Sequence, residues 1–236
     1  MKAVILSAGR GNRISSLGLP KPLIEIEGLS LLERTILFFM HLKVKEFVIV
    51  VGYRAGQIKD FLKERDISKE IEITWVENKE FCRGNGVSVL CAQDYVDNQF
   101  LLSMVDHLYD PVPFLDFPSK KGNLVCAVDS QPGFADPQGA TKVLIEDGII
   151  KEIGKNLKKY NALDCGLFLC SEKIFPVLKK TIKEGKEEWD EAKDRFAREY
   201  GAEFFDIKGG FWTDVDTPED LIRARKLLSS RKKKTK

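Results

Sequence analysis

Strand-like and helical patterns alternate along the first half of this 236-residue chain, and this alternation strongly constrains its fold. Apolar runs typical of buried strands occur at 3–6, 47–51, 71–76 and 100–105. Segments with helical spacing lie between them, at 31–41, 55–64 and 87–95. Strands that alternate with helices in this way form parallel sheets through right-handed crossovers. We therefore predict an α/β fold with a mainly parallel mixed central sheet flanked by helices.

In the second half of the chain, strand-like and helical segments no longer alternate one by one. Strand-like runs occur at 124–129, 141–146, 149–153, 163–170 and 203–207, and helical patterns at 172–182 and 188–200. Asp147-Gly148 separates two of these strands and predicts a hairpin. Thr217 suits the N-cap and Pro218 the first position of a final helix. We predict one domain over 1–228 and a basic tail over 229–236.

Composition favours a globular domain and argues against nucleic-acid binding. The chain is 43% hydrophobic and 31% charged, which is enough to bury a sizeable core. Its net charge is +2, but residues 231–236 contribute five positive charges, so the remainder carries −3. A basic footprint over the whole protein is therefore missing.

Cysteine usage and hydropathy point to a reducing compartment. The five cysteines form no C-x-x-C pair, and the chain has two histidines, so a zinc site is not expected. An odd number of cysteines favours reduced thiols, and we expect a cytoplasmic protein without a signal sequence. No apolar run reaches 18 residues, so we predict no membrane span in this chain.

A loop with two glycines and two arginines follows the first apolar run. Small residues at Ala8, Gly9 and Gly11 let backbone N–H groups approach a phosphate closely, and Arg10 and Arg13 add positive charge. Neither a Walker loop nor a G-x-G-x-x-G fingerprint fits, because the required lysine and third glycine are absent. The loop therefore predicts a phosphate site of another kind.

Lys21 lies between two prolines, thirteen residues after Ala8. Pro22 disfavours the helical region for Lys21, so we expect a stiff, extended segment that aims the ammonium group. The alternative is a solvated loop lysine.

Together, A-G-R-G-x-R at residues 8–13 and P-K-P-L at residues 20–23 resemble the signature of the sugar-nucleotidyltransferase superfamily. The resemblance implies a single Rossmann-like nucleotidyltransferase domain that transfers NMP from an NTP to a phosphorylated sugar or alcohol. It also implies that Lys21 contacts phosphate near the reacting centre and that Arg13 balances the β- and γ-phosphates. Backbone groups of Ala8, Gly9 and Gly11 would bind the nucleotide.

Two carboxylates are expected to hold Mg²⁺, which prefers oxygen ligands and keeps substrate phosphates and water in its shell. Asp106 ends a buried strand, where an ionised carboxylate is tolerated at the open end. The resemblance assigns Asp106 to catalysis and to the metal, and assigns the second ligand to a W-x-D-x-x-T segment in which Asp214 is the positional match. Asp216 is the runner-up, and capping of the final helix is its alternative role. We expect Asp220 to provide only first-turn electrostatics.

Asn85 and Ser88 are the candidates for base recognition. They follow glycines and begin a helical pattern, and their side chains offer donors and acceptors to a pyrimidine edge. The alternative is a plain turn and helix cap. In the superfamily, an N-x-x-S-like stretch at this place is typical of members that use CTP.

Lys155, Asp164 and His107 are the candidates for binding the acceptor. Lys155 resembles the lysine of the superfamily's E-K-P element, although Gly154 and Asn156 replace its acid and proline. Asp164 matches the next acceptor-contacting segment, with an edge-strand aspartate as the alternative. His107 directly follows Asp106 and is expected to support the site, because a phosphate monoester needs no base to react.

The base segment and the altered acceptor element most resemble the CTP:inositol-1-phosphate cytidylyltransferase domains that precede a membrane-embedded synthase of di-myo-inositol phosphate precursors. This resemblance implies transfer of CMP from CTP to inositol-1-phosphate, giving CDP-inositol and pyrophosphate, in compatible-solute biosynthesis. The basic tail would then link to a membrane domain. The chain is rich in Lys and Glu and has few Gln, a composition that fits a protein of a thermophile. Other acceptors (phosphocholine or a hexose-1-phosphate), a nucleotide-sensing regulatory module, and a homo-oligomer stay open.

Overall fold

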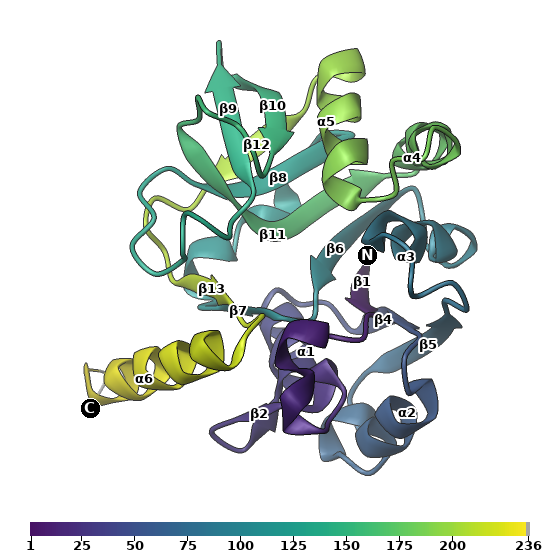
Figure 1. Cartoon of the computed structure of the whole chain (residues 1–236), viewed down its shortest axis with the longest axis vertical. Coiled ribbons are helices and arrows are strands. Elements are labelled where there is room, and N and C mark those ends of the chain that lie inside the picture. Colours follow the sequence, from purple (N-terminus) through teal and green to yellow (C-terminus); the bar gives the residue numbers. More distant parts are fainter. Residues whose placement is uncertain (235–236) are drawn as a thin grey trace.

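The computed structural model describes residues 1–234 and is built on a nine-stranded mixed sheet (Figure 1). The strands of this sheet are β1 (Lys2–Ser7), β4 (Glu46–Val51), β5 (Glu72–Glu77), β6 (Gln99–Met104), β8 (Leu124–Asp129), β9 (Lys142–Glu146), β10 (Ile149–Gly154), β11 (Ala162–Ser171) and β12 (Glu203–Asp206). Their order is β10-β9-β11-β6-β1-β4-β5, and β8 joins β11 to β12. The predicted α/β domain with a mixed central sheet is confirmed.

The two halves of the sheet have different topologies. Strands β6, β1, β4 and β5 are parallel, as the alternating sequence pattern predicts. In the second half, β11 is antiparallel to β6, β8 and β9. The predicted hairpin joins β9 to β10, and its residues Asp147 and Gly148 have φ values of 53° and 74°. Both angles suit the type I′ turn that matches the twist of a hairpin.

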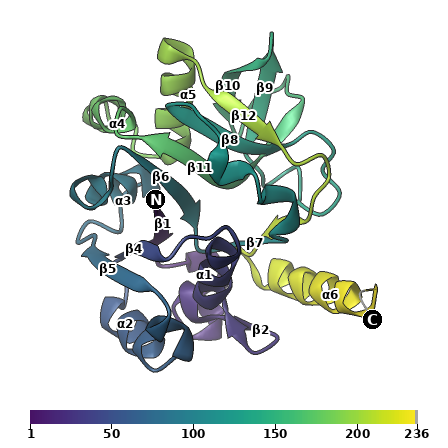
Figure 2. The ribbon, with the colours of Figure 1, turned by 180° about the vertical axis from the view of Figure 1, so that it is seen from behind.

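Helices cover both faces of the sheet (Figures 1 and 2). They are α1 (Leu31–His41), α2 (Ala55–Lys63), α3 (Asn85–Cys91), α4 (Ile174–Lys183), α5 (Trp189–Tyr200) and α6 (Pro218–Lys234). Strand β1 contributes to two cores because its side chains alternate: Ala3 and Ile5 pack with α1 and α2, whereas Val4 and Leu6 pack with α3, α4 and α5. Burial on both faces explains why β1 is a continuous apolar run.

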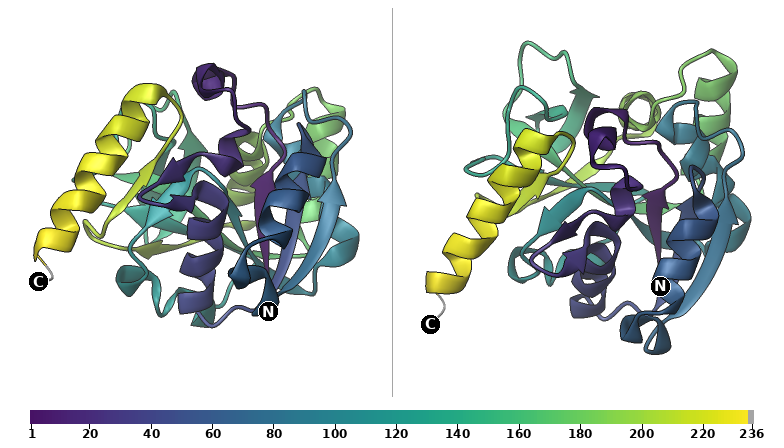
Figure 3. Two further views of the ribbon diagram at one scale, coloured as in Figure 1. Left: turned by 90° about the horizontal axis from the view of Figure 1, so that it is seen from below. Right: turned by 60° about the horizontal axis from the view of Figure 1, so that its bottom comes forward.

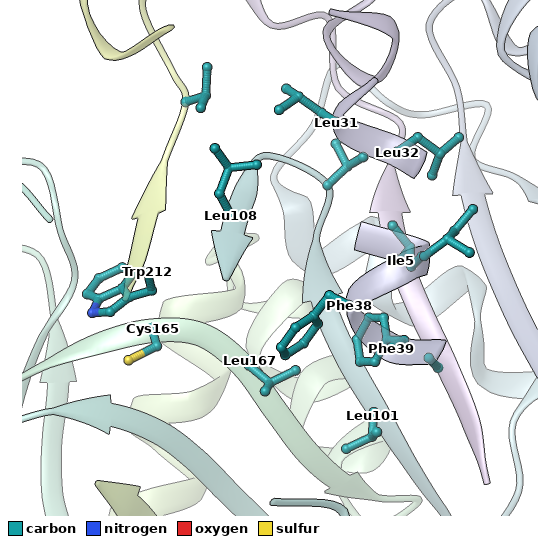
Figure 4. Packing of buried hydrophobic residues seen from close by; sticks show 14 of the residues in the cluster. Ile5, Leu31, Leu32, Phe38, Phe39, Leu101, Leu108, Cys165, Leu167 and Trp212 are labelled. Atoms are coloured by element: carbon teal, nitrogen blue, oxygen red, sulfur yellow. The ribbon is translucent and has the colours of Figure 1, made fainter. Parts of the chain in front are cut away.

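Two small two-stranded sheets connect the core to the edge at which the parallel strands end. β2 (Glu25–Ile26) pairs with β3 (Leu29–Ser30), and β7 (His107–Tyr109) pairs with β13 (Trp212–Asp214). Figure 4 shows the core below the second of these sheets, where Trp212 and Leu108 lie above Leu167 and Phe38. Burial of these large apolar side chains anchors β7 and β13, which carry residues of the predicted site.

The final helix begins with a reciprocal cap. Thr217 Oγ1 accepts from the backbone N–H of Asp220 at 3.1 Å, as predicted for an N-cap residue. The Asp220 carboxylate in turn accepts from the N–H groups of Thr217 (3.0 Å) and Asp216 (3.2 Å). Asp220 therefore does more than the expected first-turn electrostatics, because it fixes the backbone of Asp216.

Helix α6 extends along one side of the molecule, and its start lies beside the first glycine loop (Figure 3). It continues through Lys234, so the predicted boundary after residue 228 falls inside a helix. Arg231 of the predicted tail forms an ion pair with Asp110 and lies over the Phe211 ring. Residues 235 and 236 lie outside the described part of the chain. Among residues 1–234, no helix is long and apolar enough to cross a membrane.

Candidate active site

Two adjoining cavities open where the parallel strands end. The larger, about 460 Å³, lies between the glycine loop after β1 and the start of α3, and we call it the nucleotide cleft. The smaller, about 170 Å³, lies over β11 and the start of α5, and we call it the acceptor pocket. The residues that line both are Arg13, Asn85, Met104, Asp106 and Asp216. Ligands of open α/β sheets bind at this edge, so a group held by the shared residues could pass between two ligands.

Lys21 lies at this boundary between two carboxylates. Its Nζ is 2.5 Å from Oδ2 of Asp106 and 2.6 Å from Oδ1 of Asp216, and its side chain is only 9% exposed. Burial alone would lower the pKa of Lys21, but the two carboxylates raise it above its usual value. The ammonium is therefore charged at neutral pH and is held in one position.

The backbone around Lys21 differs from the extended segment predicted from the two prolines. Residues 21–23 form one turn of 3₁₀ helix, η2, in which Leu23 N–H donates to the Pro20 carbonyl at 2.9 Å. Pro22 fits a first turn because its missing N–H would have no partner there. The two ion pairs of the Lys21 ammonium outweigh the steric preference of the residue before a proline.

Asp106 follows β6, as predicted, and has two neighbours that stabilise its ionised form. Besides Lys21, His107 Nδ1 lies 2.8 Å from Asp106 Oδ1. Burial would raise the pKa of Asp106, but Lys21 and His107 together hold it well below its usual range. Asp106 is therefore an ionised carboxylate at the junction of the two cavities.

His107 is fixed by packing against Trp212 and Gly166 and by its polar contact with Asp106. Its ring stacks on Trp212 with an interplanar angle of 3° and a centroid distance of 6.2 Å. Below it lies Gly166, whose φ is 74° and at which an added Cβ would come within 2.3 Å of His107 Nε2. His107 lines the acceptor pocket, yet the contact it makes is with Asp106, whose carboxylate it orients.

The two candidate aspartates of the C-terminal segment have different surroundings. Asp216 contacts Lys21 and also Arg13 Nη2, at 2.8 Å. Asp214 pairs in register with His107 across β13 and β7, and Arg223 Nη2 lies 3.9 Å from its Oδ1. Burial raises the pKa of Asp214, which indicates a carboxylate with little compensating charge.

Oxygen donors suited to Mg²⁺ are present at the boundary of the two cavities and beside it. Asp106, Asp214 and Asp216 all line the acceptor pocket. Over residues 1–234, no three acidic, histidine or cysteine side chains form a closed metal cage. Two carboxylates completed by substrate phosphates and water are typical of Mg²⁺ sites, so this donor set fits the ion. The assignment of Asp106 with Asp214, or with Asp216, stays a prediction.

The nucleotide cleft contains the predicted loop and base-recognition residues. Ala8, Gly9 and Gly11 line it together with Arg13. Ser88 lies on α3, buried, and its Oγ accepts from Asn78 Nδ2 at 2.9 Å. Asn85 Oδ1 accepts from the Trp189 N–H at 2.7 Å, so this side chain also ties α3 to α5.

Arg83 and Phe81 line the cleft but were not singled out from the sequence. Arg83 pairs with Glu187 at 2.6 Å, and Phe81 supplies an apolar wall. The guanidinium of Arg10 lies 5.7 Å from the ring centroids of Tyr53 and Phe81. The pattern F-x-R before a glycine-flanked helix start was the signal in the sequence, but nothing in it shows which way these side chains face.

The acceptor pocket contains Lys155 and Asp164 as predicted, with two further charged residues. Lys155 is exposed at its rim. Asp164 is 3% exposed and forms an ion pair with the buried Lys193, which also lies 2.9 Å from Asp190. Lys193 and Asp190 are one helical turn apart on α5, and this spacing was the signal that the sequence offered.

This architecture defines the class of the protein: an α/β domain that binds a nucleotide at the carboxyl edge of parallel strands and brings a second ligand beside it. The family follows from a match over residues 3–129, more than half of the chain, to the model described as MobA-like NTP transferase domain. The chain belongs to this family. The prediction of a nucleotidyltransferase is thereby confirmed.

Curated relatives and a solved structure are similar over nearly the whole chain. The chain is 39% identical over 228 residues to a protein of Rubrobacter xylanophilus, and 38% over 229 residues to one of Aquifex aeolicus, both named bifunctional IPC transferase and DIPP synthase. Each match covers 96% of this chain but 51% of the relative, so the chain spans about half the length of these relatives. The structure of the inositol-1-phosphate CTP transferase from T. maritima superposes with a TM-score of 0.86 at 27% identity, covering 97% of this chain and 94% of that one.

Proposed function

We propose that this chain is a CTP:inositol-1-phosphate cytidylyltransferase, which transfers CMP from CTP to inositol-1-phosphate. The observation that carries the proposal is the contact of Lys21 with both Asp106 and Asp216 at the boundary of the two cavities. The similarity to the inositol-1-phosphate CTP transferase from T. maritima supports the choice of substrates.

The reaction is an in-line displacement at the α-phosphorus of CTP. An oxygen of the inositol-1-phosphate monoester forms a bond to that phosphorus, and the bond to the β-phosphate oxygen breaks. CDP-inositol and pyrophosphate are the products. Because the attacking oxygen is already ionised at neutral pH, the protein has to align the two phosphates and stabilise the developing charge.

The residues of this chain divide that work between the two cavities. Backbone N–H groups of the loop at residues 8–11 and the guanidinium of Arg13 would hold the triphosphate. Lys21, aimed by Asp106 and Asp216, would lie against the reacting phosphate and remain charged throughout. Asn85 and Ser88 would face the base, and Lys155 and Asp164 the acceptor side.

Mg²⁺, when bound, would neutralise phosphate charge and help the pyrophosphate leave. Asp106 would hold it, with Asp214 or Asp216 as the second protein ligand. His107 would then keep the Asp106 carboxylate in a fixed orientation through its 2.8 Å contact.

The relatives that are twice as long support a further part of the proposal. Their names describe a second activity, a DIPP synthase, and the present chain spans only about half of each. We infer that this chain supplies the transferase half, with residues after α6 leading to the other. The basic segment at 229–236, whose last two residues lie outside the described part, would be that link.

The test is a matrix of the four NTPs against inositol-1-phosphate, phosphocholine and hexose-1-phosphates, with Mg²⁺ and pyrophosphate release as the readout. We expect turnover with CTP and inositol-1-phosphate. Activity only with UTP or dTTP and a hexose phosphate would overturn the proposal, and CTP binding without any turnover would indicate a nucleotide-sensing module. Asp106→Asn should remain folded and lose about 10²–10³-fold in turnover, whereas Asp66→Asn, at an exposed ion pair with Lys69, should retain full activity.

A further inference from the structure

Asp190 is the partly exposed member of a charged cluster in the acceptor pocket. Its side chain is 25% exposed, and both of its oxygens are held by the protein. Oδ1 lies 2.9 Å from Lys193 Nζ, and Oδ2 accepts from Thr141 Oγ1 at 2.7 Å. Each carboxylate oxygen has two lone pairs, so both can accept one more hydrogen bond.

Lys193 and Asp164 form the buried base of this cluster. The Lys193 side chain is 1% exposed and lies 4.2 Å from the centroid of the Phe168 ring. Asp164 is 3% exposed, and its two oxygens accept from Lys193 Nζ and from the Gly166 N–H. Asp164, which was predicted to contact the acceptor, lines the pocket and is also the counter-ion that holds Lys193 in place.

The cluster keeps Asp190 ionised. Burial of Asp190 opposes its charged form, yet Lys193 and the Thr141 hydroxyl hold its pKa below the usual value. An ionised carboxylate accepts hydrogen bonds and donates none, and its bonds to hydroxyl groups are charge-assisted. Its natural partners in a polar pocket are neutral hydroxyl groups.

Charged groups line the pocket on both sides. Arg13 and the carboxylates around Lys21 line the part shared with the nucleotide cleft, where the acceptor's phosphate must react. Asp190, Asp164 and Lys193 lie over β11 and α5, and with Lys155 at the rim they make two positive and two negative charges. An acceptor whose phosphate lies beside the shared residues would present its neutral substituents to Asp190.

We propose that Asp190 is a specificity-determining residue, which Lys193 and Thr141 position to accept hydrogen bonds from hydroxyl groups of the acceptor. The inference rests on the proposed function, because it assumes a phosphorylated alcohol in this pocket. It names the chemistry that the pocket selects: a neutral polyhydroxylated body attached to the reacting phosphate.

The experiment compares Asp190→Asn and Asp190→Ala with the wild type in steady-state pyrophosphate release. We expect the KM for the acceptor to rise about tenfold or more, since charge-assisted bonds are about twice as strong as neutral ones, while the KM for CTP stays within twofold. Singly deoxygenated analogues of the acceptor add a second readout. One of them should be a poor substrate for the wild type yet no worse than the parent acceptor for Asp190→Ala.

Asp194→Asn is the matched control. Asp194 lies one turn further along α5, is 26% exposed and pairs with Arg198 at 2.8 Å, away from the pocket. This variant should leave both KM values unchanged. If Asp190→Asn does not fold, Thr141→Val removes one of the two holding contacts and should raise only the acceptor KM, by a smaller factor. An unchanged acceptor KM, or an equal rise in both KM values, would overturn the inference.

The outcomes separate this inference from the proposed function. Turnover of a hexose phosphate in place of inositol-1-phosphate would refute the proposed function, and the Asp190 variants would then be compared with that hexose phosphate. Absence of turnover with every phosphorylated alcohol would refute both.

Discussion

The two cavities are built in different ways from one chain. The nucleotide cleft is lined mainly by the loop at residues 6–13 and by residues at and before the start of α3. The acceptor pocket is lined by side chains from β7, β11, β13 and α5, held by ion pairs such as Lys193 with Asp164. A loop of small residues lets backbone N–H groups approach a phosphate and so suits a ligand part common to all NTPs. A wall of side chains can be changed residue by residue to suit different acceptors.

Lys21 lines the nucleotide cleft and contacts Asp106 and Asp216, which line both cavities, and its loss should give the largest effect. We expect Lys21→Met to lower kcat by about 10³-fold, because a preorganised charge at the reacting phosphate is lost and two carboxylates remain close together. Pyrophosphate release measures this. Lys69→Met, at a lysine whose side chain is 75% exposed, is the control. A variant that keeps a tenth of wild-type turnover would show that Lys21 serves the fold and not the reaction.

Gly166→Ala should damage the acceptor pocket and spare the cleft. The new Cβ would come within 2.3 Å of the His107 ring, and the φ of 74° is itself unfavourable for alanine. We expect the free energy of unfolding to fall by about 1–3 kcal/mol and the acceptor KM to rise, with the KM for CTP little changed. Urea unfolding and steady-state kinetics measure the two effects.

Gly154→Ala provides the comparison within the same half of the molecule. Its added Cβ would lie 3.8 Å from the Leu157 side chain, which is an ordinary contact. A loss of stability equal to that of Gly166→Ala would show that backbone strain and packing against His107 are not the cause.

Ser88→Ala tests a side chain of the nucleotide cleft and should give the smallest effect. Asn78 Nδ2 loses its acceptor at 2.9 Å, which costs about 1 kcal/mol. We expect a few-fold rise in the KM for CTP and no change in the acceptor KM. A larger rise in the acceptor KM than in the KM for CTP would contradict the division of the site into a nucleotide half and an acceptor half.

The same division explains what could be predicted from the sequence. The alternation of strands and helices predicted the parallel half, and Asp147-Gly148 predicted the hairpin. The loop at residues 8–13 was recognisable because its residues are neighbours in sequence. Asp190 and Lys193 have the spacing of one helical turn, but the sequence does not show that Lys193 is buried against Asp164. The choice between Asp214 and Asp216 depends on which side chain faces Lys21, and spacing alone carries no such information.

Lys21 has partners 85 and 195 residues away, and this has a consequence for how the enzyme is made. The glycine loop, Lys21 and Asp106 leave the ribosome early, whereas Asp216 follows only after β12 and β13. A nascent chain can therefore build its sheet and its phosphate loop while Lys21 still lacks its second carboxylate. Synthesis of the segment that begins α6 is thus the step that completes the charge pattern around Lys21.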